Sequence, residues 1–561
     1  MTNLRLDKEE IDAALSALSK EKIVERIWKK DWTVWKNEPK EIANRLGWLT
    51  SPDEAWKALP GIDRFVREVR RDRYTQALLL GMGGSSLAPL VLSSTFKTRP
   101  GCLDVVVLDS TAPAAVLEVS RRHDPAKTLF IVSSKSGTTA ETLSFLNFFW
   151  NRTAECPGEN RPGEHFIAIT DDGTPLAEEA RRLRFRSLFL GDPDVGGRFS
   201  ALSVFGLIPG SLKGINLRLI LKSAEEMARR CRETADVWAN PGAYLGAILG
   251  VMAQKGKDKV TFFLSPRLAA LGTWLEQLIA ESTGKQGQGL VPVEGERPGS
   301  PRVYGPDRFF IQIKMRSDVS NESALQRLNR AGFPVLSLNV PSAGYLGGQF
   351  FLWEFATAVA GHILGLNPFD QPNVDLSKKK TQGFLETYRE KGILPEEKPR
   401  LVEDGIRLFS EAKVSTLAEG LKNLLDQARP GDYIAIQAFL SPEAPTTQAL
   451  QKLRTLLRDK TGLAVTVGYG PRFLHSTGQL HKGDSGGGVF IQVTAGDSHD
   501  LAIPDAPGAS RSSLTFGILK AAQAKGDYEA LKSAGRRIIR FHLSREAEKG
   551  LARIMTAVQE N

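Results

Sequence analysis

"KTLFIVSSKSGTTAETLSFLNFFW", residues 127–150, joins an apolar run, a turn of small polar residues and a longer helical pattern. A short apolar run bounded by a turn is typical of a buried strand, and the longer stretch after it has the length of a helix. The turn holds four further hydroxyls, one lysine and one glycine within the positions that follow Ser133. Strand, turn and helix in this order predict one βα unit of a mostly parallel sheet.

The same succession recurs along the chain. "TQALLLGMGGSSLAPLVLSSTF" (75–96) again reads as strand, glycine turn and helix. Further strands are predicted at 103–110, 165–170, 186–190, 259–266, 308–315, 334–341, 433–442, 464–470 and 488–494. Strands that alternate with helices predict an α/β fold with parallel sheets covered on both faces.

A chain of 561 residues is too long for one ordinary core, so several domains are expected. We predict an N-terminal helical segment (1–45), two α/β domains (46–215 and 216–385) and a third α/β domain (400–561), separated from them by a polar stretch.

The third domain carries short echoes of the second, in the same order. Any one echo is explained by chance, and three in order are explained either by chance or by a third domain that is a diverged copy of the second. The pairs are "FFLSP" (262–266) with "AFLSP" (438–442), "ESTGK" (281–285) with "HSTGQ" (475–479), and "FFIQIK" (309–314) with "VFIQVT" (489–494).

The composition argues against a membrane protein, a disulfide-rich protein and a nucleic-acid-binding protein. The fractions of hydrophobic (41%) and charged (25%) residues are those of a soluble globular protein. The longest apolar runs, such as 244–253, are about half of a membrane span. The three cysteines, Cys102, Cys156 and Cys231, lie far apart, which favours a reducing cytoplasm over a disulfide framework or a zinc site. The net charge of +10 fits either a mixed basic surface or steering of an anionic ligand, and no basic run is interleaved with aromatics as nucleic-acid binding would favour.

Two turns have the features of an anion site. "GMGGSS" (81–86) and "SSKSGTTAET" (133–142) both follow strands, at the sheet edge where open α/β sheets bind ligands. Glycines let backbone N–H groups approach an anion, and the helix that follows adds its dipole. Neither turn has the spacing of a P-loop or a dinucleotide fingerprint. Together they predict a site for the phosphate of a metabolite, whereas each alone is also explained as a tight turn or a helix N-cap.

Three other side chains stand in chemically suggestive places. Arg198 follows two glycines ahead of an apolar helix, and Lys378 follows a proline-broken loop. Glu281 stands near the end of an apolar helix, where the helix dipole disfavours a carboxylate. Each also has a plainer interpretation as a solvated charge at a helix end.

Taken together, these stretches resemble the glucose-6-phosphate isomerase family, and they occur in the family's order. They are "GMGGSSLAP" (81–89), "SSKSGTTAET" (133–142), "GGRFSALSVFGL" (196–207), "AESTGK" (280–285) and "NPFDQPNVDLSK" (367–378). The resemblance implies two sugar-isomerase domains and the interconversion of glucose 6-phosphate and fructose 6-phosphate without metal or cofactor.

The resemblance also implies roles for individual residues. Glu281 would move the proton between C1 and C2, Arg198 would stabilise the enediolate, Gln277 would contact the substrate and Lys378 would match the lysine after the "FDQP" segment. The residues implied to hold the phosphate are Gly84, Ser85, Ser134, Lys135, Ser136 and Thr139.

The sequence departs from the family in two ways. The family's ring-opening histidine, supplied by a partner subunit, should follow soon after the catalytic glutamate, but this region has no histidine and Arg302 falls near the place. The chain also continues well past the family's usual end. That extension resembles the tail of the isomerase half in transaldolase–isomerase fusions, although the sequence holds no stretch long enough for a transaldolase barrel.

The extension offers a replacement for the missing histidine. "LHSTGQ", which begins at Leu474, resembles the bacterial segment that carries it, so we predict that His475, or else His481, serves in cis. A monomer is then expected, with a homodimer as the alternative. The alternatives to the isomerase are a sugar-phosphate-binding regulator of the same fold and an isomerase that also accepts mannose phosphate.

Overall fold

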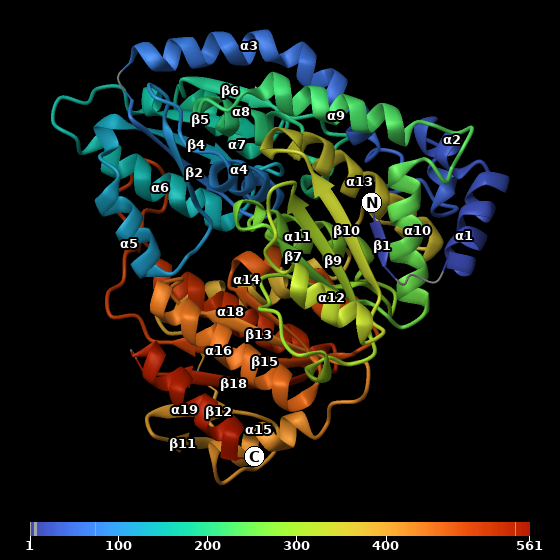
Figure 1. Cartoon of the computed structure of the whole chain (residues 1–561). Coiled ribbons are helices and arrows are strands. Elements are labelled where there is room, and N and C mark those ends of the chain that lie inside the picture. Colours follow the sequence, from blue (N-terminus) through green and yellow to red (C-terminus); the bar gives the residue numbers. More distant parts are fainter. Residues whose placement is uncertain (1, 5–7, 73, 396, 545, 561) are drawn as a thin grey trace.

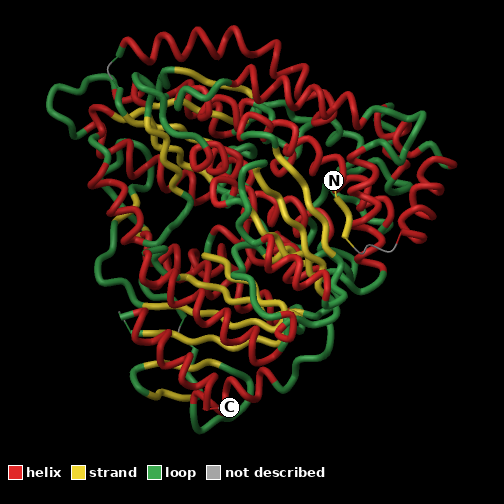
Figure 2. Tube along the Cα trace, in the orientation of Figure 1, coloured by secondary structure: helices red, strands yellow, loops and turns green. Residues whose placement is uncertain are grey.

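In the computed structural model, the chain forms three α/β units that meet around a common centre (Figure 1). Residues 2–4, 8–72, 74–395, 397–544 and 546–560 are described. The strands of each unit lie between helices, as Figure 2 shows. The predicted α/β class with mostly parallel sheets is confirmed.

The first unit has a parallel sheet in the order β3-β2-β4-β5-β6. Its strands are β2 (Gln76–Gly81), β3 (Asp104–Leu108), β4 (Thr128–Ser133), β5 (Phe166–Thr170) and β6 (Ser187–Leu190). Its helices are α3 (Ser51–Arg71), α4 (Gly84–Thr95), α5 (Pro113–Arg122), α6 (Ala140–Ala154), α7 (Pro175–Arg182) and α8 (Val204–Leu212). The pairing of Gly81 with Ser133 places the ends of β2 and β4, and therefore the two predicted phosphate turns, side by side.

The second unit has a sheet in the order β1-β10-β9-β7-β8, in which β1 alone is antiparallel. Its strands are β7 (Lys259–Leu264), β8 (Val291–Val293), β9 (Arg308–Met315), β10 (Val335–Val340) and β1 (Thr2–Leu4). Its helices are α9 (Leu217–Cys231), α10 (Pro241–Gln254), α11 (Leu271–Thr283), α12 (Glu322–Arg330), α13 (Leu346–Ile363) and α14 (Val374–Lys391). The expectation that residues 1–45 are helical holds for α1 (Lys8–Lys20) and α2 (Ile23–Trp28) but is wrong for β1, which joins the edge of this sheet.

The third unit has a sheet in the order β11-β12-β18-β15-β13-β14, in which β13, β14, β15 and β18 are parallel. Its strands are β11 (Leu401–Glu403), β12 (Ile406–Phe409), β13 (Tyr433–Phe439), β14 (Ala464–Tyr469), β15 (Gly488–Ala495) and β18 (Arg537–Leu543), with a small hairpin of β16 (Ala502–Ile503) and β17 (Leu514–Thr515). Its helices are α15 (Leu417–Leu425), α16 (Ala444–Thr461), α17 (Gly478–Gly483), α18 (Phe516–Ser533) and α19 (Ala547–Glu560).

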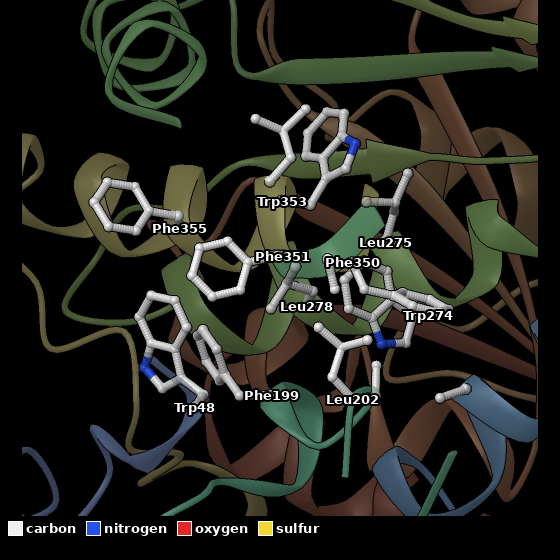
Figure 3. Packing of buried hydrophobic residues seen from close by; sticks show 14 of the residues in the cluster. Trp48, Phe199, Leu202, Trp274, Leu275, Leu278, Phe350, Phe351, Trp353 and Phe355 are labelled. Carbon is white, nitrogen blue, oxygen red and sulfur yellow. The ribbon is translucent and has the colours of Figure 1, made fainter. Parts of the chain in front are cut away.

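The first two units share one hydrophobic core. Trp48, ahead of α3, packs on Phe199 of the first unit at 5.3 Å between ring centroids and on Phe351 of α13 at 5.8 Å (Figure 3). Because Arg198 directly precedes Phe199, this packing fixes the backbone that carries the predicted catalytic arginine.

The third unit docks on the first through α18. Phe516 stacks on Phe145 of α6 at 5.7 Å, and the side-chain amide of Asn147 donates to the carbonyl of Pro504. A second contact joins Arg472 to Asp109 after β3, with two N–H···O bonds of 2.7 and 2.6 Å. These contacts bring residues from opposite ends of the chain to one place.

Candidate active site

A large cavity, of about 810 Å³, lies where the three units meet. It is bounded by the N-termini of α4 and α6, the segment around Arg198, α11, α14, α18 and residues 474–475. The predicted site residues that line it are Gly84, Ser85, Lys135, Ser136, Thr139, Arg198, Gln277, Glu281, Lys378 and His475. The structure therefore brings ten of the predicted residues to one cavity, and they come from all three units.

The glycines of the turn 81–86 let its backbone lie close to the neighbouring segment 196–198. Gly83 has a φ of +54°, a conformation that favours glycine. A Cβ on Gly84 would lie 2.1 Å from the carbonyl oxygen of Gly197, so the turn touches the backbone next to Arg198. The hydroxyl of Ser133 donates to the carbonyl of Ser85 at 3.0 Å and ties this turn to the second one.

The second turn is held by its own hydroxyls. Ser134 is buried and its Oγ lies 2.9 Å from Oγ1 of Thr139, so it stands behind Thr139 and does not line the cavity itself. Lys135 Nζ lies 2.7 Å from a carboxylate oxygen of Asp171. Burial lowers the pKa of Lys135 and raises that of Asp171, against the effect of this ion pair. No local pattern in the sequence indicates that a carboxylate already partners the lysine.

Glu281 and Arg198 face each other across the cavity wall. Arg198 Nη1 lies 3.7 Å from Glu281 Oε2, and Gln277 Nε2 donates to the same carboxylate oxygen at 3.1 Å. All three residues are at least nine-tenths buried, which strengthens their electrostatic interactions. Glu281 and Gln277 stand one turn apart on α11, so both point to the same side.

Arg198 is fixed by the loop 367–373. Its Nη2 donates to the carbonyls of Pro368 and Asp370, and its Nε donates to Ser282 Oγ at 2.8 Å. Lys285, which was not predicted, holds the same loop through Asp370 at 2.7 Å. Burial, and then the charge of Arg198, lower the pKa of Lys285 to about 8.

His475 is paired with a carboxylate of the first unit. Its Nε2 lies 2.9 Å from Oε1 of Glu141, and the amide of Gln523 donates to the same oxygen at 2.7 Å. Burial raises the pKa of Glu141, but His475 and the hydrogen bonds together outweigh it and lower that pKa. Gln277 Nε2 donates to the carbonyl of His475 at 2.8 Å, so a single side chain separates this backbone from Glu281.

The remaining candidates lie in different surroundings. Lys378 lines the cavity as an exposed residue of α14, whereas Arg302 is exposed and is not among the lining residues. His481 is buried among rings of the third unit, 5.1 Å from Phe490 between centroids. Burial, followed by Lys482 and Arg536, lowers the pKa of His481 well below its ordinary value, so it is a neutral core residue.

This arrangement is suited to proton transfer on a small anion. It combines a buried carboxylate beside a guanidinium, an imidazole backed by a second carboxylate, and hydroxyls at two helix N-termini. Among the described residues, no group of three or more His, Cys, Asp or Glu is placed to hold a metal ion. Nor does any described helix combine the length and apolarity that crossing a membrane requires.

The comparisons with known proteins agree on one family. A model of the phosphoglucose isomerase family matches residues 69–293. A glucose-6-phosphate isomerase of Thermus thermophilus is 30% identical over 396 residues, which cover 62% of this chain and 91% of the relative. That of Carboxydothermus hydrogenoformans is 28% identical and covers 65% and 91%.

Solved structures add the fold. The crystal structure of a hypothetical protein from Thermus thermophilus has a TM-score of 0.56 and 28% identity, and the match covers 68% of this chain and 99% of that protein. Glucose-6-phosphate isomerase from Chlamydia trachomatis has a TM-score of 0.58 at 17% identity, covers 69% of this chain and 87% of its own, and shows likeness of fold alone. With sequence relatives covered over nine-tenths of their length, this chain belongs to the glucose-6-phosphate isomerase family.

Proposed function

We propose that this chain interconverts glucose 6-phosphate and fructose 6-phosphate through an enediolate, with Glu281 as the base. The observation that carries the proposal is the convergence of Glu281–Arg198 and His475–Glu141 on one cavity. A carboxylate is a competent base for a proton α to a carbonyl, and a guanidinium offsets the oxyanion that develops there.

The reaction divides into ring opening and isomerisation. The imidazole of His475 gives a proton to the ring oxygen and takes one from the anomeric hydroxyl, and Glu141 stabilises the imidazolium. Glu281 then removes the proton from C2 of the aldose, which leaves an enediolate, and returns it to C1. The hydroxyl proton on O2 passes to O1 in the same interconversion, so the carbonyl moves from C1 to C2. Arg198 lies close enough to Glu281 to stabilise the charge on the intermediate oxygen.

The phosphate is proposed to bind at the two turns. Ser85, Ser136 and Thr139 present hydroxyls to the cavity, beside the N-termini of α4 and α6. Ser134 orients Thr139 from behind. Lys378 stands on α14 at another wall of the same cavity and would contact the sugar oxygens.

A regulator that only binds sugar phosphate is the weaker alternative. Its main support was the lack of a histidine near residue 302, and His475 now stands beside Glu141 in the cavity. The proposal needs no second subunit for catalysis, so a monomer remains the expected state. All three cysteines are free thiols, which supports the proposed cytoplasmic location.

Solvent exchange at C2 tests the base. Glu281→Gln should bind substrate nearly as well but lose isomerisation by a factor on the order of 10²–10⁴, together with deuterium uptake from ²H₂O. Glu386→Gln is the matched control, because Glu386 lines the same cavity and hydrogen-bonds only the side chain of Gln382 in the described structure. Exchange retained in Glu281→Gln would assign the base to another group, and absence of isomerisation in the unaltered protein would favour the regulator.

A further inference from the structure

A second, smaller cavity lies at the carboxyl edge of the third sheet. It has a volume of about 210 Å³. Its lining residues come from the ends of β13, β15 and β18, from β12, from α18 and from the loop before β11. They are Glu397, Arg407, Phe409, Phe439, Thr494, Ala495, Gly496, Asp497, Lys520, Ala521, Ala524, Lys525, Arg540 and His542. Drug-sized ligands occupy pockets of roughly 300–1,000 Å³, so this one has room for a smaller molecule.

The charges around this cavity are unbalanced. The lining includes four cationic side chains and two carboxylates. The cations are Arg407, Lys520, Lys525 and Arg540, and the carboxylates are Glu397 and Asp497. Lys520 pairs with Asp497 at 2.6 Å and Arg540 with Glu397 at 3.1 Å, which uses both carboxylates. Lys525 donates to the carbonyl of Pro395. The side chain of Arg407 has no hydrogen bond or ion pair within the described part of the chain, so its positive charge is not compensated there.

The pKa of His542 reflects the positive charge around this cavity. Its Nδ1 lies 3.0 Å from Oγ1 of Thr494, at the end of β15. Burial, and then four neighbouring cations that include Arg407 and Arg540, lower the pKa of His542 to about 4. The imidazole therefore stays neutral near pH 7 and is available to an anion as a hydrogen-bond partner.

The position of the cavity matches that of the catalytic phosphate turns. In the first sheet the third strand, β4, leads into the hydroxyl-rich turn, and in the third sheet the third parallel strand, β15, leads into Gly496, Asp497 and Ser498. Open α/β sheets bind ligands beyond the carboxyl ends of their strands. The same place in the fold thus carries a cavity with at least one cation and one hydroxyl in both units.

We propose that this cavity is a second anion site, which binds a small phosphorylated metabolite as an effector. Both carboxylates are held in ion pairs, so neither is free to serve as the base of a second isomerase site. Arg407 is placed to meet the phosphate, and Phe439 offers an apolar surface to the rest of the ligand. Lys525 lines the same cavity with its Nζ donating to the carbonyl of Pro395, and it adds positive charge there.

Helix α18 connects this site to the catalytic cavity, a part of the proposal that rests on the proposed function. Leu519 and Gln523 line the catalytic cavity, whereas Lys520 and Ala524 line the second one. Gln523 also donates to Glu141, the partner of His475. An anion that shifts α18 would therefore change the turnover number without competing for the substrate.

Calorimetry with inorganic phosphate tests the site on the full chain. We expect two binding events in the unaltered protein. Arg407→Gln with Lys525→Gln should weaken one of them about tenfold or more, since charge-assisted hydrogen bonds are lost. Ser134→Ala with Thr139→Val should weaken the other. Lys422→Gln with Lys549→Gln removes two exposed charges elsewhere in the same unit and should leave both unchanged.

The outcomes separate this site from the catalytic one. A single event that disappears in Ser134→Ala with Thr139→Val would overturn the proposal, as would two unchanged events in Arg407→Gln with Lys525→Gln. The binding result does not depend on isomerase activity, so failure of the proposed function would be seen separately. The link through α18 predicts non-competitive inhibition or activation by phosphate that is absent in the Arg407–Lys525 variant, and purely competitive behaviour would refute that link.

Discussion

At the scale of single residues, the pairing of His475 with Glu141 fits the proposed role of the imidazole in opening the sugar ring. His475→Ala should reduce turnover of the cyclic sugar by about 10²–10⁴, and turnover of a ring-opened analogue far less, because only ring opening needs the imidazole. Glu141→Gln should give a smaller loss on the same substrate, with a shifted pH profile, because the carboxylate acts through the histidine. Steady-state kinetics with both substrates measure the difference.

His499→Ala is the control for a histidine elsewhere in the third unit, since His499 is exposed and its side chain hydrogen-bonds only Ser498 among the described residues. Equal losses of His475→Ala on the cyclic and the open substrate would show that the histidine does not open the ring.

The free energy of unfolding should depend on pH through the buried carboxyl group of Glu276. Burial, and then the nearby carboxylate of Glu294, raise the pKa of Glu276 to about 8 from 4.5. The folded state therefore holds this proton more tightly than the unfolded state. Its contribution is fully present below about pH 4.5 and is lost as the pH rises towards 8, at about 1.4 kcal/mol for each pKa unit.

Glu276→Gln removes this titration, because an amide has no proton to lose. Chemical unfolding at about pH 5 and about pH 8 should show a smaller fall in the free energy of unfolding for the variant than for the unaltered protein, by a few kcal/mol. A fall of the same size in both proteins would mean that Glu276 is not the titrating group.

Several site residues were predictable from the sequence and others were not. The resemblance named Arg198 and Glu281 because they stand in short motifs that the chain keeps intact. Glu141 lies within a quoted motif but was missed, since an acidic residue in the first turn of a helix is already explained by the helix dipole. Its partner His475 is 334 positions away, and no local pattern records such a contact.

At the scale of elements, the approach of α4 to the segment 196–198 sets the phosphate turn. Gly84→Ala would place a methyl group against the carbonyl of Gly197, and backbone cannot move as a side chain can. We expect a loss of about 1–3 kcal/mol in stability and a raised KM, measured by thermal unfolding and kinetics.

Gly61→Ala is the matched change, in an exposed turn of α3 with no atom near the new methyl group. It should stabilise the helix by roughly 0.5–1 kcal/mol and leave KM unchanged. If Gly84→Ala behaved in the same way, the close approach of α4 to the segment 196–198 would not matter for substrate binding.

The elements that the sequence predicted are those with strong local patterns. β2 and β4 are continuous apolar runs because helices cover both faces, so Leu78 and Leu79 pack into different clusters. β18 was missed because "RIIRFHL" mixes arginines and a histidine into a strand, and two of these, Arg540 and His542, face the second cavity. β8 has only three residues, too few for a periodic pattern.

At the scale of the whole molecule, the third unit brings His475 to the cavity of the first two units within one chain. An equimolar mixture of Glu281→Gln and His475→Ala, co-refolded from the denatured state, should remain inactive, because each chain needs both groups from itself. Isomerase assays before and after co-refolding measure this. Recovery of activity would show that the histidine is exchanged between chains.

The three sheets have related strand orders. In all three units the first four parallel strands follow the order 4-3-1-2, so this order does not distinguish the proposed duplication of the second unit from a fold that all three share. Two of the echoes occupy matching places, in the first and third of these strands. The third does not: "ESTGK" precedes β8 whereas "HSTGQ" follows β14. Strand order depends on long-range pairing, so the sequence could not reveal which echo was accidental.

Strand β1 also has a consequence for how the molecule behaves among its copies. It covers the outer edge of β10, and β12 covers β18 at the equivalent edge of the third sheet, each in antiparallel pairing. An uncovered edge offers unpaired N–H and C=O groups to any strand that arrives, which is a common route to aggregation. A few residues near the start of the chain thus cover the backbone groups of β10 that another strand could otherwise pair with.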